Sequence, residues 1–200
     1  TKTELDSYEC RHGIGYSRFT SSKNGVKASV LSFVPLNDNC EISQLTLTNG
    51  SSEDKKLSVF SYVEWCLWNA DDDMKNFQRN LSTGEVEVQD STIYHKTEYR
   101  ERRNHYAIYS VNTKIDGFDT SRDAFLGAYR GADSPEAVEN GKCTNSMASG
   151  WSPIASHQIN VDLAAGETKT FIFVLGYIEN PEDEKWESYG VINKTRAKEM

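Results

Sequence analysis

The sequence has no long hydrophobic run, which excludes a membrane-spanning helix from its 200 residues. Its longest apolar stretch, residues 171–178, has 8 residues, whereas a helix needs about 20 apolar residues to cross a bilayer. No basic segment followed by an apolar stretch opens the chain, so no secretory signal is visible. We therefore expect no membrane partner and a cytoplasmic location.

Cysteine and positive charge are also scarce. The 4 cysteines, Cys10, Cys40, Cys66 and Cys143, form no C-x-x-C pair and no Cys/His spacing of a zinc site. Cysteines this far apart are expected to be free thiols in a reducing compartment. The 22 Lys and Arg are outnumbered by 30 Asp and Glu, for a net charge of -8. Because nucleic acid is bound by concentrated positive charge, we expect no nucleic-acid partner. Because the Cys/His spacing of a zinc site is missing, we also expect no metal site.

Catalytic motifs are missing as well. The chain contains no G-x-S-x-G, no H-E-x-x-H and no phosphate-binding glycine loop. Ser156 and His157 are adjacent, and neighbours on a strand point to opposite faces, so they cannot form a nucleophile and its base. Many carboxylates could serve as the acid of a glycosidase, and none is singled out. The residues by themselves predict no catalytic group.

Aromatic residues and short strand-like runs are what the sequence does contain. Aromatic residues make up 11% of the chain, which excludes a disordered protein. Alternating or β-branched runs bounded by turn formers predict strands over residues 27–34, 41–48, 57–68, 91–100, 106–111, 157–163 and 168–177. Asn24-Gly25 suits a type I′ turn, and residues 164–167 suit a second hairpin turn. The pattern predicts an all-β fold, an antiparallel β-sandwich.

The domain organisation follows from a change of composition near Pro181. Residues 1–180 are expected to form the β-sandwich domain. Pro181 and the acidic residues after it predict a helix in residues 181–200, the start of a linker toward an absent domain. Residues 130–149 are expected to be a functional or interfacial loop. Because Thr1 is not an initiator and the end falls in a polar stretch, we expect a piece of a longer chain that lacks its N-terminal edge.

A polar segment follows the aromatic-rich run of residues 57–68. The aspartates of residues 71–73 could bind calcium, but their spacing does not fit the D-x-D-x-D-G loop. A solvated acidic turn or helix N-terminus is the favoured interpretation. Gln78 and Arg79 follow the end of the aromatic strand, where a sandwich presents ligand contacts.

Three further clusters leave alternatives open. Residues 95–106 are either an ion-pair network on a solvated strand, a polar interface to another domain, or a ligand contact. In residues 117–127 two aspartates bracket an arginine, which favours a turn with a local salt bridge. Trp151 either stacks on a sugar ring or, more commonly, closes the edge of a sandwich.

Taken together, these clusters resemble the N-terminal β-sandwich, of supersandwich type, of the cellobiose phosphorylases in glycoside hydrolase family 94. The stretches that carry the resemblance are residues 8–16, 60–80, 95–107, 117–127, 149–157 and 171–181. They cover almost the whole chain in the order that the family has.

The resemblance implies a glycosyltransferase that splits cellobiose with inorganic phosphate into α-glucose 1-phosphate and glucose, with inversion. Phosphate is then the nucleophile, so a single carboxylic acid suffices. In the family, that acid and the phosphate ligands lie in an (α/α) barrel that these 200 residues lack. No cofactor is implied beyond phosphate as co-substrate, and the fragment alone is expected to be inactive.

The resemblance also assigns two binding residues. Alignment to the family places Arg79 where an arginine helps to bind the acceptor glucose, with Gln78 as its companion. A guanidinium offers several donors to sugar hydroxyls. The family further implies a homodimer. Two other hypotheses stay open: a free-standing carbohydrate-binding module, and a hydrolase in its own right.

Overall fold

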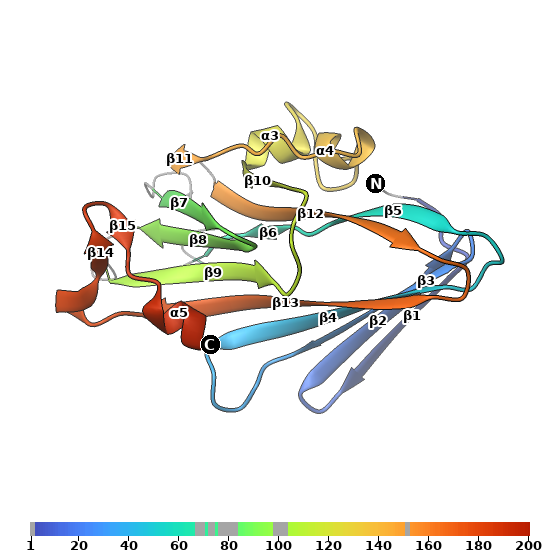
Figure 1. Ribbon diagram of the computed structural model, residues 1–200, viewed down its shortest axis with the longest axis horizontal. Coiled ribbons are helices and arrows are strands. Elements are labelled where there is room, and N and C mark those ends of the chain that lie inside the picture. The colour runs from blue at the N-terminus through green and yellow to red at the C-terminus, as the bar shows by residue number, and fades with distance from the viewer. Residues whose placement is uncertain (1–2, 67–70, 72–74, 76–83, 98–103, 151–152) are drawn as a thin grey trace.

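The computed structural model describes residues 3–66, 71, 75, 84–97, 104–150 and 153–200. Nearly all of the regular elements are strands (Figure 1). The strands of the larger sheet are β1 (Ser7–Gly13), β2 (Tyr16–Lys23), β3 (Val26–Phe33), β4 (Cys40–Asn49), β7 (Gly84–Gln89), β8 (Thr92–Thr97), β9 (His105–Val111), β11 (Ser149–Gly150) and β13 (Thr168–Glu179). The smaller sheet contains β5 (Lys55–Phe60), β6 (Val63–Glu64), β10 (Gly117–Ser121) and β12 (Pro153–Leu163).

The two sheets pack face to face, which confirms the predicted all-β sandwich. Among the described residues the larger sheet has 9 strands in the order β1-β2-β3-β4-β13-β9-β8-β7-β11. The smaller has 4 strands, β10-β12-β5 with β6 beside β12. Every strand pair in the described part of the chain is antiparallel.

Most predicted strands are present with shifts of one or two residues at their ends. Two predictions differ more: β12 begins 4 residues before the predicted start at residue 157, and the single strand predicted over residues 57–68 is replaced by β5, a break at residues 61–62, and the short β6. Asn24 and Gly25 have φ angles of 52° and 78°, as a type I′ turn requires. At the second predicted turn, the amide of Glu167 donates to the carbonyl of Ala164 at 3.0 Å. The pattern did not reveal β1, β2, β7 or β10.

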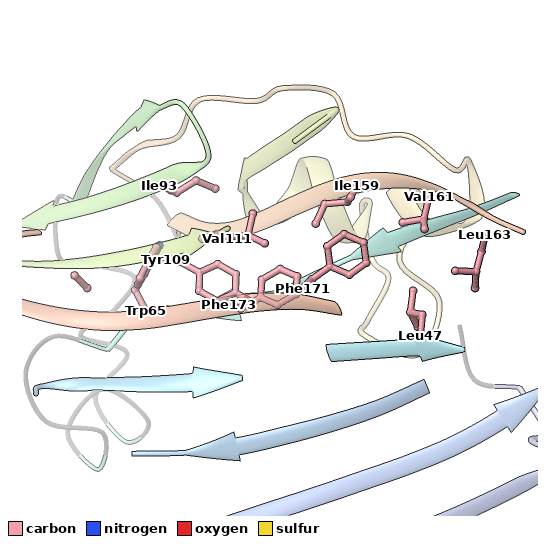
Figure 2. Packing of buried hydrophobic residues seen from close by; sticks show 12 residues of the cluster. Leu47, Trp65, Ile93, Tyr109, Val111, Ile159, Val161, Leu163, Phe171 and Phe173 are labelled. Atoms are coloured by element: carbon pink, nitrogen blue, oxygen red, sulfur yellow. The ribbon is translucent and has the colours of Figure 1, made fainter. Parts of the chain in front are cut away.

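The main core lies between the sheets, on what we call the inner face of the larger sheet. Alternate residues of β4, β9 and β13 point into it, and Figure 2 shows Tyr109 and Phe173 side by side at its centre. The smaller sheet contributes residues such as Ile159 and Leu163 from β12. Burial of these aliphatic and aromatic side chains is the main force that holds the sheets together.

Each sheet is also covered on its outer face. On the smaller sheet lie α3 (Arg122–Leu126) and α4 (Glu136–Glu139), with Phe125 buried against Ile154. Within residues 130–149 the regular elements are α4 and the first residue of β11, so this region has little regular structure, as predicted. On the larger sheet lies the C-terminal segment, residues 181–200, whose Ile192 is buried against Tyr106.

The C-terminal segment differs from the helix predicted for it. It consists of the single 3-10 turn η1 (Glu182–Glu184), the hairpin strands β14 (Trp186–Ser188) and β15 (Val191–Ile192), and the short helix α5 (Thr195–Glu199). Asn180, which is buried just before the segment, donates through Nδ2 to the carbonyl of Asn193 at 3.0 Å. This hydrogen bond holds the end of the segment next to its start. These tertiary contacts override the local helix preference of the acidic residues.

Two other expectations concern the cysteines, which were expected to be free thiols, and a membrane-spanning helix, which was not expected. All four cysteines are thiols; Cys10 and Cys66 are exposed, whereas Cys40 and Cys143 are buried. Burial raises the pKa of Cys143 to about 12, with the nearby Asp119 adding to the effect, so this thiol stays protonated. Within the described residues, no helix combines the length and the apolar character that a membrane crossing requires.

Candidate functional site

Gln78 and Arg79, the residues assigned to a sugar, lie outside the described residues. The last described strand before this segment is β6, which Trp65 follows, and the described strands resume at Gly84, the first residue of β7. Trp151, the other candidate for a sugar contact, also lies outside the described residues. Trp65 and Gly84 flank the segment of Gln78 and Arg79 in the sequence, and we call the described groups around them the base of the candidate site.

The base is built on a stacked pair of rings. Trp65 and His95 have ring centroids 5.3 Å apart and planes 11° from parallel. Both rings are buried, and burial lowers the pKa of His95 to about 4, so its imidazole is neutral at neutral pH. Among the described residues, neither Trp65 Nε1 nor His95 Nδ1 has a hydrogen-bond partner. The base therefore has two buried polar ring atoms without a hydrogen-bond partner among the described residues.

Gly84 lets the rings sit this close to the sheet. A Cβ at this position would lie 2.3 Å from Cε1 of His95 and 3.1 Å from Cγ of Pro153. The first of these distances is far inside van der Waals contact. Only glycine allows β7 to begin directly beside the imidazole.

A charged cluster forms the rim beside this base. Glu64, at the end of β6, accepts hydrogen bonds from Tyr62 Oη at 2.5 Å and from Arg122 Nε at 3.1 Å. Burial, and then the neighbouring Glu64 carboxylate, raise the pKa of Tyr62. The Tyr62 ring stacks on Phe125 at 5.1 Å, which ties β6 to α3. The cluster fixes the end of β6.

This pairing corrects part of the expectation for residues 117–127. The ion pair of Arg122 is with Glu64, from a distant strand, and not with the aspartates that bracket it in the sequence. Asp119 is fully buried and accepts hydrogen bonds from the amides and hydroxyls of Thr144 and Ser146, at 2.6–3.1 Å. Asp119 therefore fastens the long segment of residues 130–149 onto the smaller sheet, and its carboxylate is fully committed.

The second buried histidine is also structural. His157 has no exposed surface and stacks on Tyr109 with centroids 4.9 Å apart. Its Nδ1 lies 3.2 Å from Oγ of Ser61, and burial lowers its pKa to about 4. The hydroxyl beside it thus belongs to Ser61 and not to the adjacent Ser156, as the strand geometry predicts. Because the ring is sealed in the core, no substrate can reach this pair.

In the polar run of residues 95–106, the structure buries His95, Lys96 and Tyr106. Lys96 is 7% exposed, and its Nζ lies 2.9 Å from Oε1 of Glu87 on β7. The other carboxylate oxygen of Glu87 accepts from Lys194, which is 5% exposed. The solvated-strand interpretation is therefore wrong for Lys96. Its partners belong to an interface with the C-terminal segment, and residues 98–103 lie outside the described part of the chain.

Sequence reasoning did not find the central member of this network. Glu87 lies between two valines, so the alternation shows only a polar position on a strand. Burial alone would raise the pKa of Glu87, but hydrogen bonds from Lys194, the amide of Ile192 and Lys96 outweigh it and lower the pKa. The carboxylate is therefore ionised between two ammonium groups.

Metal ligands are not brought together in the part of the chain that the structure describes. No group of three or more His, Cys, Asp or Glu side chains in that part could hold a metal ion. Asp71 pairs with Lys75 at 2.8 Å, one helical turn away, which fits a solvated acidic turn. The other two aspartates of the run lie outside the described residues.

Fold and site together define a β-sandwich scaffold in which the buried charged groups Asp119, Glu87 and Lys96 hold segments of the domain together. The family profile described as "Glycosyl hydrolase 94, supersandwich domain" matches residues 1–197. The chain belongs to this family, as the resemblance implies.

Curated relatives carry the same domain in longer chains. The chain is 32% identical over 170 residues to the N,N'-diacetylchitobiose phosphorylase of Vibrio proteolyticus, covering 84% of this chain and 21% of the relative. It is 30% identical over 188 residues to the solabiose phosphorylase of Paenibacillus borealis, and this match covers 90% of this chain and 24% of the relative. A third relative is the cyclic beta-(1,2)-glucan synthase NdvB of Rhizobium meliloti (strain 1021), which is 29% identical over 191 residues. That match covers 95% of this chain and 6% of the relative. The chain thus spans less than a quarter of each of these proteins.

Proposed function

We propose that this chain is the N-terminal β-sandwich domain of an inverting disaccharide phosphorylase, which we call the parent protein. The observation that carries the proposal is the match of the family profile to residues 1–197. The parent would cleave cellobiose with inorganic phosphate to α-glucose 1-phosphate and glucose. Phosphorylases among the relatives act on other disaccharides, so the family assignment supports phosphorolysis more strongly than it supports cellobiose.

In this proposal the chain supports the reaction without performing it. Inversion by phosphate needs one general acid, which must lie in a cleft beside the glycosidic oxygen. The buried carboxylates Asp119 and Glu87 are each held by several donors of the domain itself, so neither is free for that role. The acid and the phosphate ligands would belong to an (α/α) barrel elsewhere in the parent protein, which the domain would contact.

The domain's own contribution would be to the acceptor glucose. Arg79, with Gln78 beside it, would bind the sugar hydroxyls from the segment that leaves the sandwich at Trp65. The stacked Trp65–His95 pair and the Glu64–Arg122 ion pair support this role, because they hold the base of the segment rigid. We further propose that the parent is a cytoplasmic homodimer that needs no cofactor besides its phosphate co-substrate.

A disaccharide panel tests the proposed reaction. The parent protein is incubated with phosphate and, in separate reactions, with cellobiose, N,N'-diacetylchitobiose and solabiose, and sugar 1-phosphate is measured. We expect release from cellobiose in excess of the other two. Release from another member of the panel would retain phosphorolysis and correct the substrate. No release from any disaccharide would contradict the proposal.

The binding residues are tested in the synthetic direction. Arg79→Ala in the parent should raise the KM for glucose about tenfold or more, because a charge-assisted hydrogen bond to a ligand contributes about 1.5–3 kcal/mol. Gln78→Ala should have a smaller effect of the same kind. Arg11→Ala, a change at an exposed arginine on β1, is the matched control. Acceptor kinetics equal to the control would remove Arg79 from the site.

A further inference from the structure

Hydroxyl side chains gather on the outer face of the larger sheet, over β2, β3, β4 and β13. Because Leu45 and Leu47 of β4 face the core, the alternate residues Thr46 and Thr48 point outward. The register extends this face in two rows: Thr20, Ser29, Thr46 and Thr170 form one, and Ser22, Lys27, Thr48 and Thr168 form the other. All of these residues are half-buried or exposed. The C-terminal segment covers the same face of β13 farther along, at Ile178.

The hydroxyls of the two rows are linked in pairs that keep a proton to donate. Three pairs of hydroxyl oxygens lie 3.0–3.4 Å apart: Thr20 with Ser29, Thr46 with Thr170, and Thr48 with Thr168. One hydrogen bond between two hydroxyls uses only one of their two protons. The face can therefore donate hydrogen bonds to a ligand and still keep its own.

A hollow of about 220 Å³ lies on this face. Its floor consists of Thr20, Ser29, Thr46 and Thr48, and its other lining residues are Arg18 and Lys27. Lys27 is opposite Ser22, four residues from Arg18, so the α-carbons of the two cations are about 14 Å apart. The hollow is thus a floor of hydroxyls with a long cationic side chain at each end.

The two cations have no counter-charge in the described part of the chain. Neither Arg18 nor Lys27 forms an ion pair with a described residue. Glu9, which lies opposite Thr20 on β1, is already paired with Arg11 at 2.8 Å. The hollow therefore concentrates positive charge on a chain whose net charge is -8, and such a site attracts anions.

We propose that this hollow binds the phosphate group of a small ligand. A phosphate monoester carries a charge of about −1.5 to −2 at neutral pH and three strong acceptor oxygens, so it can use both cations and the floor together. A carboxylate has a single charge and two oxygens in one plane, which would leave part of the site unused. The volume is below the about 300–1,000 Å³ of sites that enclose a drug-sized ligand, so the hollow fits a charged group. Inorganic phosphate and a sugar phosphate both carry this group.

Titrations of the isotope-labelled 200-residue chain, followed by amide NMR, test the proposal. Inorganic phosphate and α-glucose 1-phosphate are the two probes, and glucose and acetate at matched ionic strength are the controls. We expect saturable shifts in residues 18–20, 27–29 and 46–48 with the phosphate-bearing probes and none with the controls. The probe that saturates at the lower concentration identifies the source of the group.

Removing either cation should weaken the binding. Arg18→Gln and Lys27→Gln should each raise the dissociation constant about fivefold or more, because charge-assisted hydrogen bonds to phosphate are the strong ones. Lys56→Gln is the matched control, since it removes one positive charge from an exposed lysine of β5, on the other sheet. It should change the dissociation constant by less than about twofold, because salt screens a distant exposed charge.

The same hollow can be tested in the parent protein through Lys27 itself. Acetylation by an N-hydroxysuccinimide ester, followed by peptide mass spectrometry, reports how accessible each ammonium is. At a phosphate concentration of about twice the dissociation constant, Lys27 should react about threefold more slowly, because about one site in three is then free. Lys56 should react at an unchanged rate.

Three results would overturn the proposal. Shifts that grow linearly with every salt would show only the screening of a charged surface. Saturable shifts with glucose or acetate would mean that the face does not select phosphate. Phosphate binding that survives in the Arg18→Gln, Lys27→Gln double variant would place the anion elsewhere. The inference goes beyond the proposed function, and since no measurement uses turnover, a parent without phosphorylase activity would leave this test unaffected.

Discussion

The ammonium of Lys194 lies 2.5 Å from a carboxylate oxygen of Glu87, and the two side chains are only 6% and 19% exposed. This contact joins the C-terminal segment to β7. Because Lys96 binds the other oxygen of the same carboxylate, one glutamate neutralises two nearly buried ammonium groups. The segment after residue 181 is therefore an integral part of the sandwich.

Removing that carboxylate should destabilise the domain strongly. Glu87→Gln leaves Lys96 and Lys194 without their common counter-charge, and breaking a buried pair from one side costs about 3 kcal/mol or more. The free energy of unfolding, from chemical denaturation followed by fluorescence, measures the loss. Glu85→Gln is the control, because Glu85 also contacts Lys96 but is 64% exposed; it should cost less than about 1 kcal/mol. Equal losses for the two variants would contradict the account.

The two buried histidines should make the domain sensitive to mild acid. Burial lowers the pKa of His95 and of His157 to about 4, compared with about 6.5 in an unfolded chain. Between these values the unfolded state binds more protons, so stability is complete above about pH 6.5 and is lost as the pH falls toward 4. Each histidine adds up to about 1.4 kcal/mol per pH unit within this window.

Unfolding free energies measured from pH 7 to pH 4 check this dependence. His95→Gln should flatten the slope, whatever its effect on stability at pH 7. A profile for the unmodified protein that is flat over the window would be incompatible with two buried neutral imidazoles.

Asp119 should control the order of the long segment over the smaller sheet. Asp119→Asn replaces one acceptor oxygen by a donor in a site where Thr144 and Ser146 only donate, which costs about 1–3 kcal/mol. Amide hydrogen exchange of residues 142–148 should accelerate. Asp123→Asn, at an exposed aspartate of α3, is the matched variant and should leave exchange there unchanged. Unaltered exchange in both variants would mean that other contacts fasten the segment.

Gly84 should tolerate no side chain. Gly84→Ala places a Cβ against His95 and Pro153, and overpacking of this kind costs about 1–3 kcal/mol. Gly50→Ala is a suitable comparison, because the nearest atom to its Cβ would be 3.4 Å away. Thermal unfolding of the two variants tests the difference. A melting temperature for Gly84→Ala as high as that for Gly50→Ala would argue against the close packing of the ring.

Local pattern was enough to predict the sandwich. Alternation over residues 41–48 corresponds to β4, and the positive φ angles of Asn24 and Gly25 are those that an Asn-Gly turn adopts. What lies on the outer faces could not be predicted, because alternation identifies a strand without saying which distant segment covers it. The burial of Lys96 is one example: its ammonium contacts Glu87, 9 residues before it, and donates to the carbonyl of Gly190, 94 residues after it.

The candidate site was less predictable than the fold. The sugar-binding assignment of Gln78 and Arg79 came from resemblance to a family and stays a prediction. The Trp65–His95 stack joins residues that are 30 positions apart, and nothing in the sequence around either residue predicts the contact. The pairing of Arg122 with Glu64 was missed for the same reason, since the nearer aspartates were the obvious partners.

The central claim is that this domain supports a phosphorolysis whose chemical step takes place elsewhere in the parent protein. The most direct measurement incubates the 200-residue chain and the parent separately with cellobiose and phosphate, and follows glucose 1-phosphate and its anomer by NMR. The account predicts α-glucose 1-phosphate from the parent and none from the folded chain. Release of glucose 1-phosphate by the chain alone would contradict it.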